Sequence, residues 1–136
     1  MKDLETALQT KLAADTGAGG LMTFVTGVYN LVAPASTTYP YLVFQKVVGT
    51  PGYTLGQRIG TGYLYQFRII GEGGSKATIL DALARLDSLL TDQVLTVGGT
   101  AAWYVRRDGD MPDVAEMDGG VLFLQVGATY RIELGG

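Results

Sequence analysis

Cysteine and histidine are both missing from this chain of 136 residues. Without cysteine, the protein forms no disulfide bond and holds no metal ion through thiolates. Without histidine, it lacks the usual general base and the commonest zinc ligand. The two absences argue against most hydrolytic and metal-dependent chemistry. We therefore expect no catalytic residue, no metal ion and no cofactor, and predict that the protein is not an enzyme.

Charge is scarce as well. Only 17% of the residues are charged, whereas 47% are hydrophobic and 20 are glycine. Globular domains usually have about 25% charged residues and about 7% glycine. The length suits one domain, residues 1–136, whose core is large enough to be stable without disulfides. An isoelectric point near 4.7 argues against general binding of nucleic acid by a basic face, and no run of about 18 apolar residues is present to cross a membrane.

The acidic side chains avoid one long segment of the chain. Residues 16–71 contain none, and Lys46, Arg58 and Arg68 give this segment a net charge of +3, whereas residues 72–136 carry −5. Six of the eight tyrosines also lie in residues 16–71. Interface cores are poor in Asp, Glu and Lys and rich in Tyr, so the segment could be surface that another chain covers. It could equally consist of core strands whose polar positions are Thr, Ser and Gln.

Two helices are predicted from the spacing of apolar residues. Leu4, Leu8 and Leu12 recur every four residues and predict a helix over residues 2–14. The clearest element is a helix over residues 75–91, with Ser75 as its N-cap and an apolar stripe along one side. This stripe consists of Ile79, Leu83, Leu86 and Leu90. We expect both stripes to lie in the core.

Strands are predicted between and after the helices. Alternation in residues 61–70 places Tyr63 and Tyr65 on one face with Phe67 and Ile69. Further strands are expected at residues 28–32, 39–48, 94–97, 101–107 and 121–134, the last as a pair with a turn near Gly127. Residues 49–60 are predicted to be a long connection and residues 108–120 a polar loop. The fold class is therefore α+β, in the order α-β-β-β-α-β-β-β, with two helices packed on one face of an antiparallel or mixed sheet.

Three segments invite a chemical interpretation. Residues 71–76 join a strand to a helix through glycines but lack the Walker spacing. Residues 103–107 combine aromatic and basic side chains, as platforms for single-stranded nucleic acid do, but so does any amphipathic strand that ends in arginines. The densest charge cluster has five acidic residues and no basic partner: Asp108, Asp110, Asp113, Glu116 and Asp118. Carboxylates can hold calcium, but the spacing is not that of an EF-hand, and we interpret this cluster as a solvated loop.

Two stretches carry a family resemblance. Residues 28–34 are VYNLVAP and residues 38–45 are TYPYLVFQ. They resemble the Tyr-Asn … Pro … Tyr-Pro-Tyr-hydrophobic-Phe signature of the tail-completion proteins of long-tailed phages (siphoviruses). These are small tail terminators and head–tail joining proteins, similar in fold to the lambda tail terminator. The resemblance covers nearly the whole chain and departs from the family at the glycine-rich residues 51–56, where a more polar segment is expected.

The resemblance implies a structural virion protein at the tail–head junction, assembled in the host cytoplasm. Such a protein caps the finished tail tube as a ring, usually a hexamer, ends tube polymerisation and provides the head-attachment surface. Its partners are copies of itself, the tail tube protein and the head connector or neck proteins, and genome DNA passes through its lumen without specific binding. In such a ring we expect Tyr53, Arg58, Tyr63 and Tyr65 at subunit or tube contacts. We expect the five acidic residues at the lumen or rim, where carboxylates repel DNA phosphates.

Two other classes stay open. The protein could have a different structural role in the same particle, as a tube subunit or a head-side stopper. It could also be a small-ligand-binding α+β domain with the tyrosine-lined sheet as its pocket. The charge pattern is compatible with each of these classes, and the state of assembly of the purified protein distinguishes them.

Overall fold

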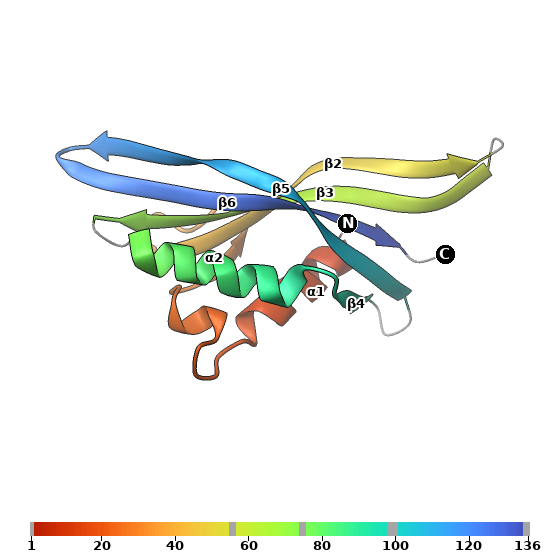
Figure 1. The fold of residues 1–136 in the computed structure, drawn as a ribbon, viewed down its shortest axis with the longest axis horizontal. Helices are drawn as coiled ribbons and strands as arrows, with labels where there is room; N and C mark the ends of the chain where they lie inside the picture. Colours follow the sequence, from red (N-terminus) through yellow and green to blue (C-terminus); the bar gives the residue numbers. More distant parts are fainter. Residues whose placement is uncertain (1, 55–56, 74–75, 98–100, 135–136) are drawn as a thin grey trace.

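A six-stranded mixed sheet organises the fold in the computed structural model, which describes residues 2–54, 57–73, 76–97 and 101–134 (Figure 1). The helical elements are α1 (Lys2–Ala13), the short 3-10 helix η1 (Leu21–Thr23) and α2 (Lys76–Leu90). The strands are β1 (Val28–Asn30), β2 (Tyr41–Thr54), β3 (Gln57–Glu72), β4 (Val94–Val97), β5 (Ala101–Asp118) and β6 (Val121–Leu134). Their order in the sheet is β1-β2-β3-β6-β5-β4. Only β1 and β2 pair in parallel, and every other pairing is antiparallel. The α+β class is thus confirmed.

The core lies between the sheet and the helices, and aromatic rings form its centre. Phe44 stacks on Phe67 with ring centroids 5.6 Å apart, and Phe67 meets the edge of Tyr130 at 5.4 Å. These contacts join β2, β3 and β6 across three neighbouring strands. Fully buried leucines and isoleucines from both helices cover the rings: Leu4, Leu8, Leu12, Ile79, Leu86 and Leu90. The two predicted apolar stripes therefore lie in the core, although Leu83 packs only at its margin.

The helices differ in how they meet the sheet, so the expectation of two helices packed on one face is met only in part. Helix α2 lies along β3, β6 and β5, whereas α1 contacts β1 and β4, the two outermost strands. The sheet is strongly twisted and curls toward the helices (Figure 1). This curl is the reason that a single short helix reaches both edges of the sheet. The observed element order also includes η1, as an additional turn after α1.

Asp15 fastens the segment after α1 to the second helix. Its two carboxylate oxygens accept hydrogen bonds of 2.8 Å from Nε and Nη2 of Arg85 on α2. One of them also accepts a 2.6 Å hydrogen bond from the backbone N–H of Leu21, at the start of η1. The hydrogen bond from Arg85, opposed by partial burial and assisted by the Leu21 amide, lowers the pKa of Asp15 from 3.8 to about 2. Residues 70 positions apart in the sequence are thereby joined by one charge-assisted contact.

The predicted loops at residues 49–60 and 108–120 are wrong. Both segments are largely strand: β2 and β3 continue as one long hairpin to residues 54 and 57, and β5 continues to Asp118 with two register shifts, between Arg107 and Gly109 and between Met111 and Val114. Residues 51–54 and 57–61 form a two-stranded ribbon beyond the end of β6, whereas residues 114–116 pair with a part of β6 that itself pairs with β3. Neither segment shows a regular alternation of apolar and polar residues in the sequence, which is the signal of a half-buried strand. The predicted N-cap Ser75 and the predicted turn at Gly98 and Gly99 lie outside the described residues.

The predicted turn near Gly127 is wrong as well, because β6 is a single strand through this position. Gly127 pairs with Arg68 of β3 and with Met111 of β5. A Cβ atom at residue 127 would collide with the backbone carbonyl oxygen of Phe67 and would lie 3.1 Å from Sδ of Met111. Glycine is therefore needed here for the close approach of neighbouring backbones, not for a turn.

Gly127→Ala is expected to destabilise the protein by about 2–4 kcal/mol, because the added methyl group must push apart strands at the centre of the sheet. Denaturant unfolding monitored by circular dichroism measures the change in the free energy of unfolding. Gly109→Ala is the matched control, since a Cβ atom there meets nothing closer than Oγ1 of Thr129 at 3.9 Å. Equal stability of the two variants would contradict the close approach at Gly127.

Asp15→Asn is expected to lower the free energy of unfolding by about 1 kcal/mol at neutral pH, since a charge-assisted hydrogen bond is lost and Arg85 is partly exposed to water. A group whose pKa is lowered by folding stabilises the folded state above its ordinary pKa. The advantage of the wild type should therefore shrink as the pH falls from about 3.8 toward 2. Urea unfolding of both proteins across this range tests the prediction, with Asp81→Asn, at an exposed position of α2, as the control. An advantage that persists at the lowest pH would contradict it.

Candidate assembly surface

Two hairpin arms project from the body of the protein toward opposite ends (Figure 1). The β2–β3 arm consists of residues 51–54 and 57–61, which pair only with each other because β6 reaches β3 no further than Gly62. The β5–β6 arm consists of residues 112–121, all of which are exposed. The β2–β3 arm is two-stranded, whereas in the β5–β6 arm only the tip is, because residues 123–125 of β6 pair both with Val114–Glu116 and with β3. An isolated two-stranded ribbon is at best marginally stable in water. Arms of this kind are suited to contact with another molecule.

The four residues predicted at subunit contacts lie in two different environments. Tyr53 and Arg58 face each other in the register of the β2–β3 arm. Tyr63 is half-buried beside Trp103, at a ring distance of 5.7 Å, and Lys46 lies over its ring. Tyr65 is fully buried in the core, where burial raises the pKa of its hydroxyl group. The expectation for Tyr65 is therefore corrected, because its ring is covered by the protein's own helices and cannot touch a second chain.

The five predicted acidic residues divide into paired and unpaired groups. Asp108 lies 3.6 Å from Arg131, and Asp110 forms an ion pair with Arg107. The expectation that the cluster has no basic partner is thus wrong for these two, whose partners come from the same strand or its neighbour. The other three are exposed on the β5–β6 arm without an ion pair in the described part of the chain: Asp113, Glu116 and Asp118. Among the described residues no group of three carboxylates is arranged to hold a metal ion.

A charged network anchors the base of the β5–β6 arm to α2. Asp87 on α2 accepts hydrogen bonds from three side chains: Arg107 Nη1 at 2.5 Å, Thr91 Oγ1 at 2.7 Å and Tyr130 Oη at 2.8 Å. Burial alone would raise the pKa of Asp87, but the three donors outweigh it and hold the pKa below its ordinary value. Arg107 also contacts Asp110 on its own strand. The strand that carries the arm is therefore held by α2 as well as by the sheet.

Among the described residues, large apolar side chains are exposed at two single positions, Val47 of β2 and Leu80 of α2, and in three groups. One is the segment after β1, where Leu31 is 62% and Val32 is 71% exposed. The second is the β5–β6 arm, with Val114, Met117 and Val121, and the third is the pair formed by Val94 of β4 and Tyr104 of β5. Leu31 also adopts φ of 74°, a left-handed conformation that a leucine rarely takes. A strained backbone that exposes apolar side chains indicates a contact site.

Leu31→Asn is expected to stabilise the isolated protein by about 0.5–1 kcal/mol, because asparagine tolerates the left-handed conformation better than leucine does. Thermal unfolding measures the gain. Val32→Asn is the control, since Val32 is equally exposed but is not among the residues with positive φ. A gain of the same size in both variants would indicate that surface polarity, and not backbone strain, is the cause.

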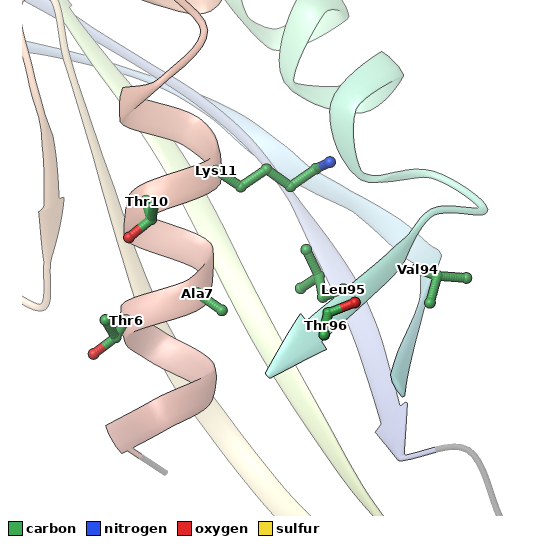
Figure 2. Close-up of a pocket in the computed structure, with 7 residues that line it drawn as sticks. All are labelled: Thr6, Ala7, Thr10, Lys11, Val94, Leu95 and Thr96. Atoms are coloured by element: carbon green, nitrogen blue, oxygen red, sulfur yellow. The ribbon is translucent and has the colours of Figure 1, made fainter. Parts of the chain in front are cut away.

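An open groove runs along the junction of α1 and β4, which contact each other. Its volume is about 570 Å³, and it is lined by Thr6, Ala7, Thr10 and Lys11 of α1 and by Val94, Leu95 and Thr96 of β4. Figure 2 shows the Lys11 side chain extending from α1 across one end of the groove, above Leu95 and Thr96 of β4 in this view. Lys11 is the charged residue of this lining, and its charge is among those that lower the pKa of Asp15. The groove could not be predicted from the sequence, because nothing in the sequence places the first helix next to the fourth strand.

Comparison with known proteins shows the fold. No family model and no curated protein matches the sequence. A chain in the solved virion of a native gene transfer agent (GTA) particle aligns with a TM-score of 0.75 at 17% identity, over 99% of this chain and 96% of its own length. A second solved chain aligns with a TM-score of 0.55, also at 17% identity, over 96% of this chain and 94% of its own. The whole chain therefore shares its fold with a component of a virus-like particle. In the described residues, no helix has the length and apolar character needed to cross a membrane.

Proposed function

We propose that this protein is a structural component of a phage-like virion and that it caps the finished tail tube as a ring. The observation that carries the proposal is the likeness of fold, over nearly the full length of both chains, to a component of a gene transfer agent virion. The signature in residues 28–45 supports the narrower role, since it resembles that of tail terminators and head–tail joining proteins. The ring would end tube polymerisation and present a surface to the head connector.

The arms support a ring in particular. They point in opposite directions, so a copy can contact one neighbour with each end (Figure 1). Contacts of this head-to-tail kind use two different surfaces and close into a ring when the rotation between copies fits. A hexamer is the size that the family resemblance implies. Tyr53, Arg58 and Tyr63 remain our candidates for contacts with the neighbour or the tube.

The remaining features agree with a protein that binds other protein chains and does not catalyse a reaction. The chain lacks histidine and cysteine, and we propose that it has no enzymatic activity and needs no cofactor. Asp113, Glu116 and Asp118 add unpaired negative charge to an exposed arm. At the rim or lumen of a ring, such charge would repel DNA phosphates and let the genome pass. The virion, at the junction of tail and head, is the location we propose.

The purified protein is expected to form discrete rings as its concentration rises, because each copy offers two unlike contact surfaces. Sedimentation velocity over a wide concentration range, with negative-stain electron microscopy of the largest species, tests this expectation. Tubes that grow without limit would favour a tube subunit. A monomer at every concentration whose melting temperature rises with a small ligand would favour a ligand-binding domain and would contradict the ring.

A further inference from the structure

The face of the sheet opposite α2 carries aromatic and acidic side chains near the β5–β6 arm. Strand residues alternate with their buried neighbours, so Glu72 of β3 and Phe123 of β6 lie on this helix-free face. Phe123 has Glu72 as its cross-strand neighbour on β3 and Glu116 as its neighbour on β5. The ring of Tyr39 lies 5.3 Å from that of Phe123, and the ring of Tyr41 lies 5.2 Å from that of Tyr39. We call these residues, Tyr39, Tyr41, Glu72, Glu116 and Phe123, the aromatic–acidic patch.

The patch has room and charge for a cation from another chain. A hollow of about 310 Å³ lies beside it, lined by Thr38, Tyr39, Pro40, Glu72 and Gly73. Glu72 and Glu116 are exposed and form no ion pair in the described part of the chain. The nearby cation, Lys76 of α2, lies on the helix side of the sheet, where it lines a separate small cavity with Asp113. Uncompensated carboxylates next to aromatic rings suit a guanidinium or ammonium group, which the ring faces also attract.

The β2–β3 arm has the complementary composition. It contains no acidic residue, and Arg58 is its only charged residue. Its one aromatic residue is Tyr53, and tyrosine and arginine are among the residues that contribute most to the affinity of protein interfaces. Opposite charges guide association, and like charges at an interface are costly. The β2–β3 arm therefore fits the aromatic–acidic patch, whereas two patches or two such arms do not fit each other.

The arm cannot reach the patch of its own molecule, because the β2–β3 arm and the end of β3 that carries Glu72 lie toward opposite ends of the protein (Figure 1). We propose that the β2–β3 arm of one copy docks on the aromatic–acidic patch of the next copy, with Arg58 beside the carboxylates of Glu72 and Glu116. The contact joins unlike surfaces, as a closed ring requires. The inference rests on the ring proposed above and names the contact that closes it.

Carbodiimide cross-linking tests the contact directly. Arg58→Lys keeps the positive charge and adds an amine, which the reagent joins to a carboxylate in contact with it. Isotope-labelled and unlabelled copies are mixed, so that mass spectrometry separates links between copies from links within one copy. Links between copies should join residue 58 to Glu72 or Glu116 and not to Asp81, an exposed residue of α2. The wild type is the matched control and should give no link at residue 58, because arginine does not react.

The outcomes separate the contact from the ring. Rings that form without a link from residue 58 to either carboxylate would overturn the contact and leave the proposed function standing. Linked open chains without closed rings would support the contact and contradict the ring. A protein that stays monomeric and unlinked at every concentration would contradict both.

Charge reversal provides a second, independent readout. Arg58→Glu and Glu116→Lys should each raise the concentration at half-assembly about tenfold, because each places like charges together. The double variant should return this concentration to within about threefold of the wild type, since opposite charges are restored. Asp81→Lys, on an exposed site of α2, should have no comparable effect. Circular dichroism melting confirms that every variant is folded, and a double variant that assembles no better than the single variants would sink the pairing of Arg58 with Glu116.

Discussion

The pairing of β3 with β6 is the constraint on which the rest of the structure depends. The two strands run antiparallel from Gly62 opposite Glu133 to Glu72 opposite Phe123. They supply the central core rings, with Phe67 on one strand and Tyr130 on the other. All other strands attach outward from this pair, β2 and β1 on one side and β5 and β4 on the other. Gly127 keeps the two backbones in close contact at its middle.

The pairing of β3 with β6 also determines where the two arms lie. Because β3 begins five residues before its first partner in β6, the β2–β3 hairpin continues beyond the sheet at one end. At the other end, β5 and β6 extend past α2 and carry the second arm. The register of one strand pair therefore decides that the protein is elongated and that its contact surfaces lie far apart. A one-residue shift of that register would turn the core side chains of the shifted strand to the opposite face of the sheet.

Much of the body could be predicted from the sequence, because the apolar residues of a half-buried helix or strand repeat with the period of that element. The leucines of α1 and the stripe of α2 repeat as a helix repeats, and the alternation that groups Tyr65 with Phe67 and Ile69 describes a face that is buried. The sequence does not say what covers that face, which is why Tyr65 was expected at a contact between subunits. The arms leave no period, since residues 112–121 are all exposed and the sequence of the β2–β3 arm does not alternate. Glycine, Pro51 and Pro112 then make these strands look like loops.

The acid-free segment, residues 16–71, combines two environments that composition alone does not separate. Part of it is core strand, as the burial of Leu42, Phe44 and Phe67 shows. For this part, the interpretation as core strands with uncharged polar positions is correct. Another part is the exposed segment with Leu31 and Val32, which lies outside the core. The groove between α1 and β4 was beyond prediction for a different reason. It depends on the curl of the sheet, a property of all six strands together.

The network around Asp87 has a mechanical consequence. Force applied to the tip of the β5–β6 arm would be transmitted along the two strands to the base of the arm, at Arg107 and Tyr130. Both side chains donate hydrogen bonds to Asp87, so part of this force would act on α2, which is packed against the sheet. Backbone hydrogen bonds between β5 and β6 therefore need not bear the whole load.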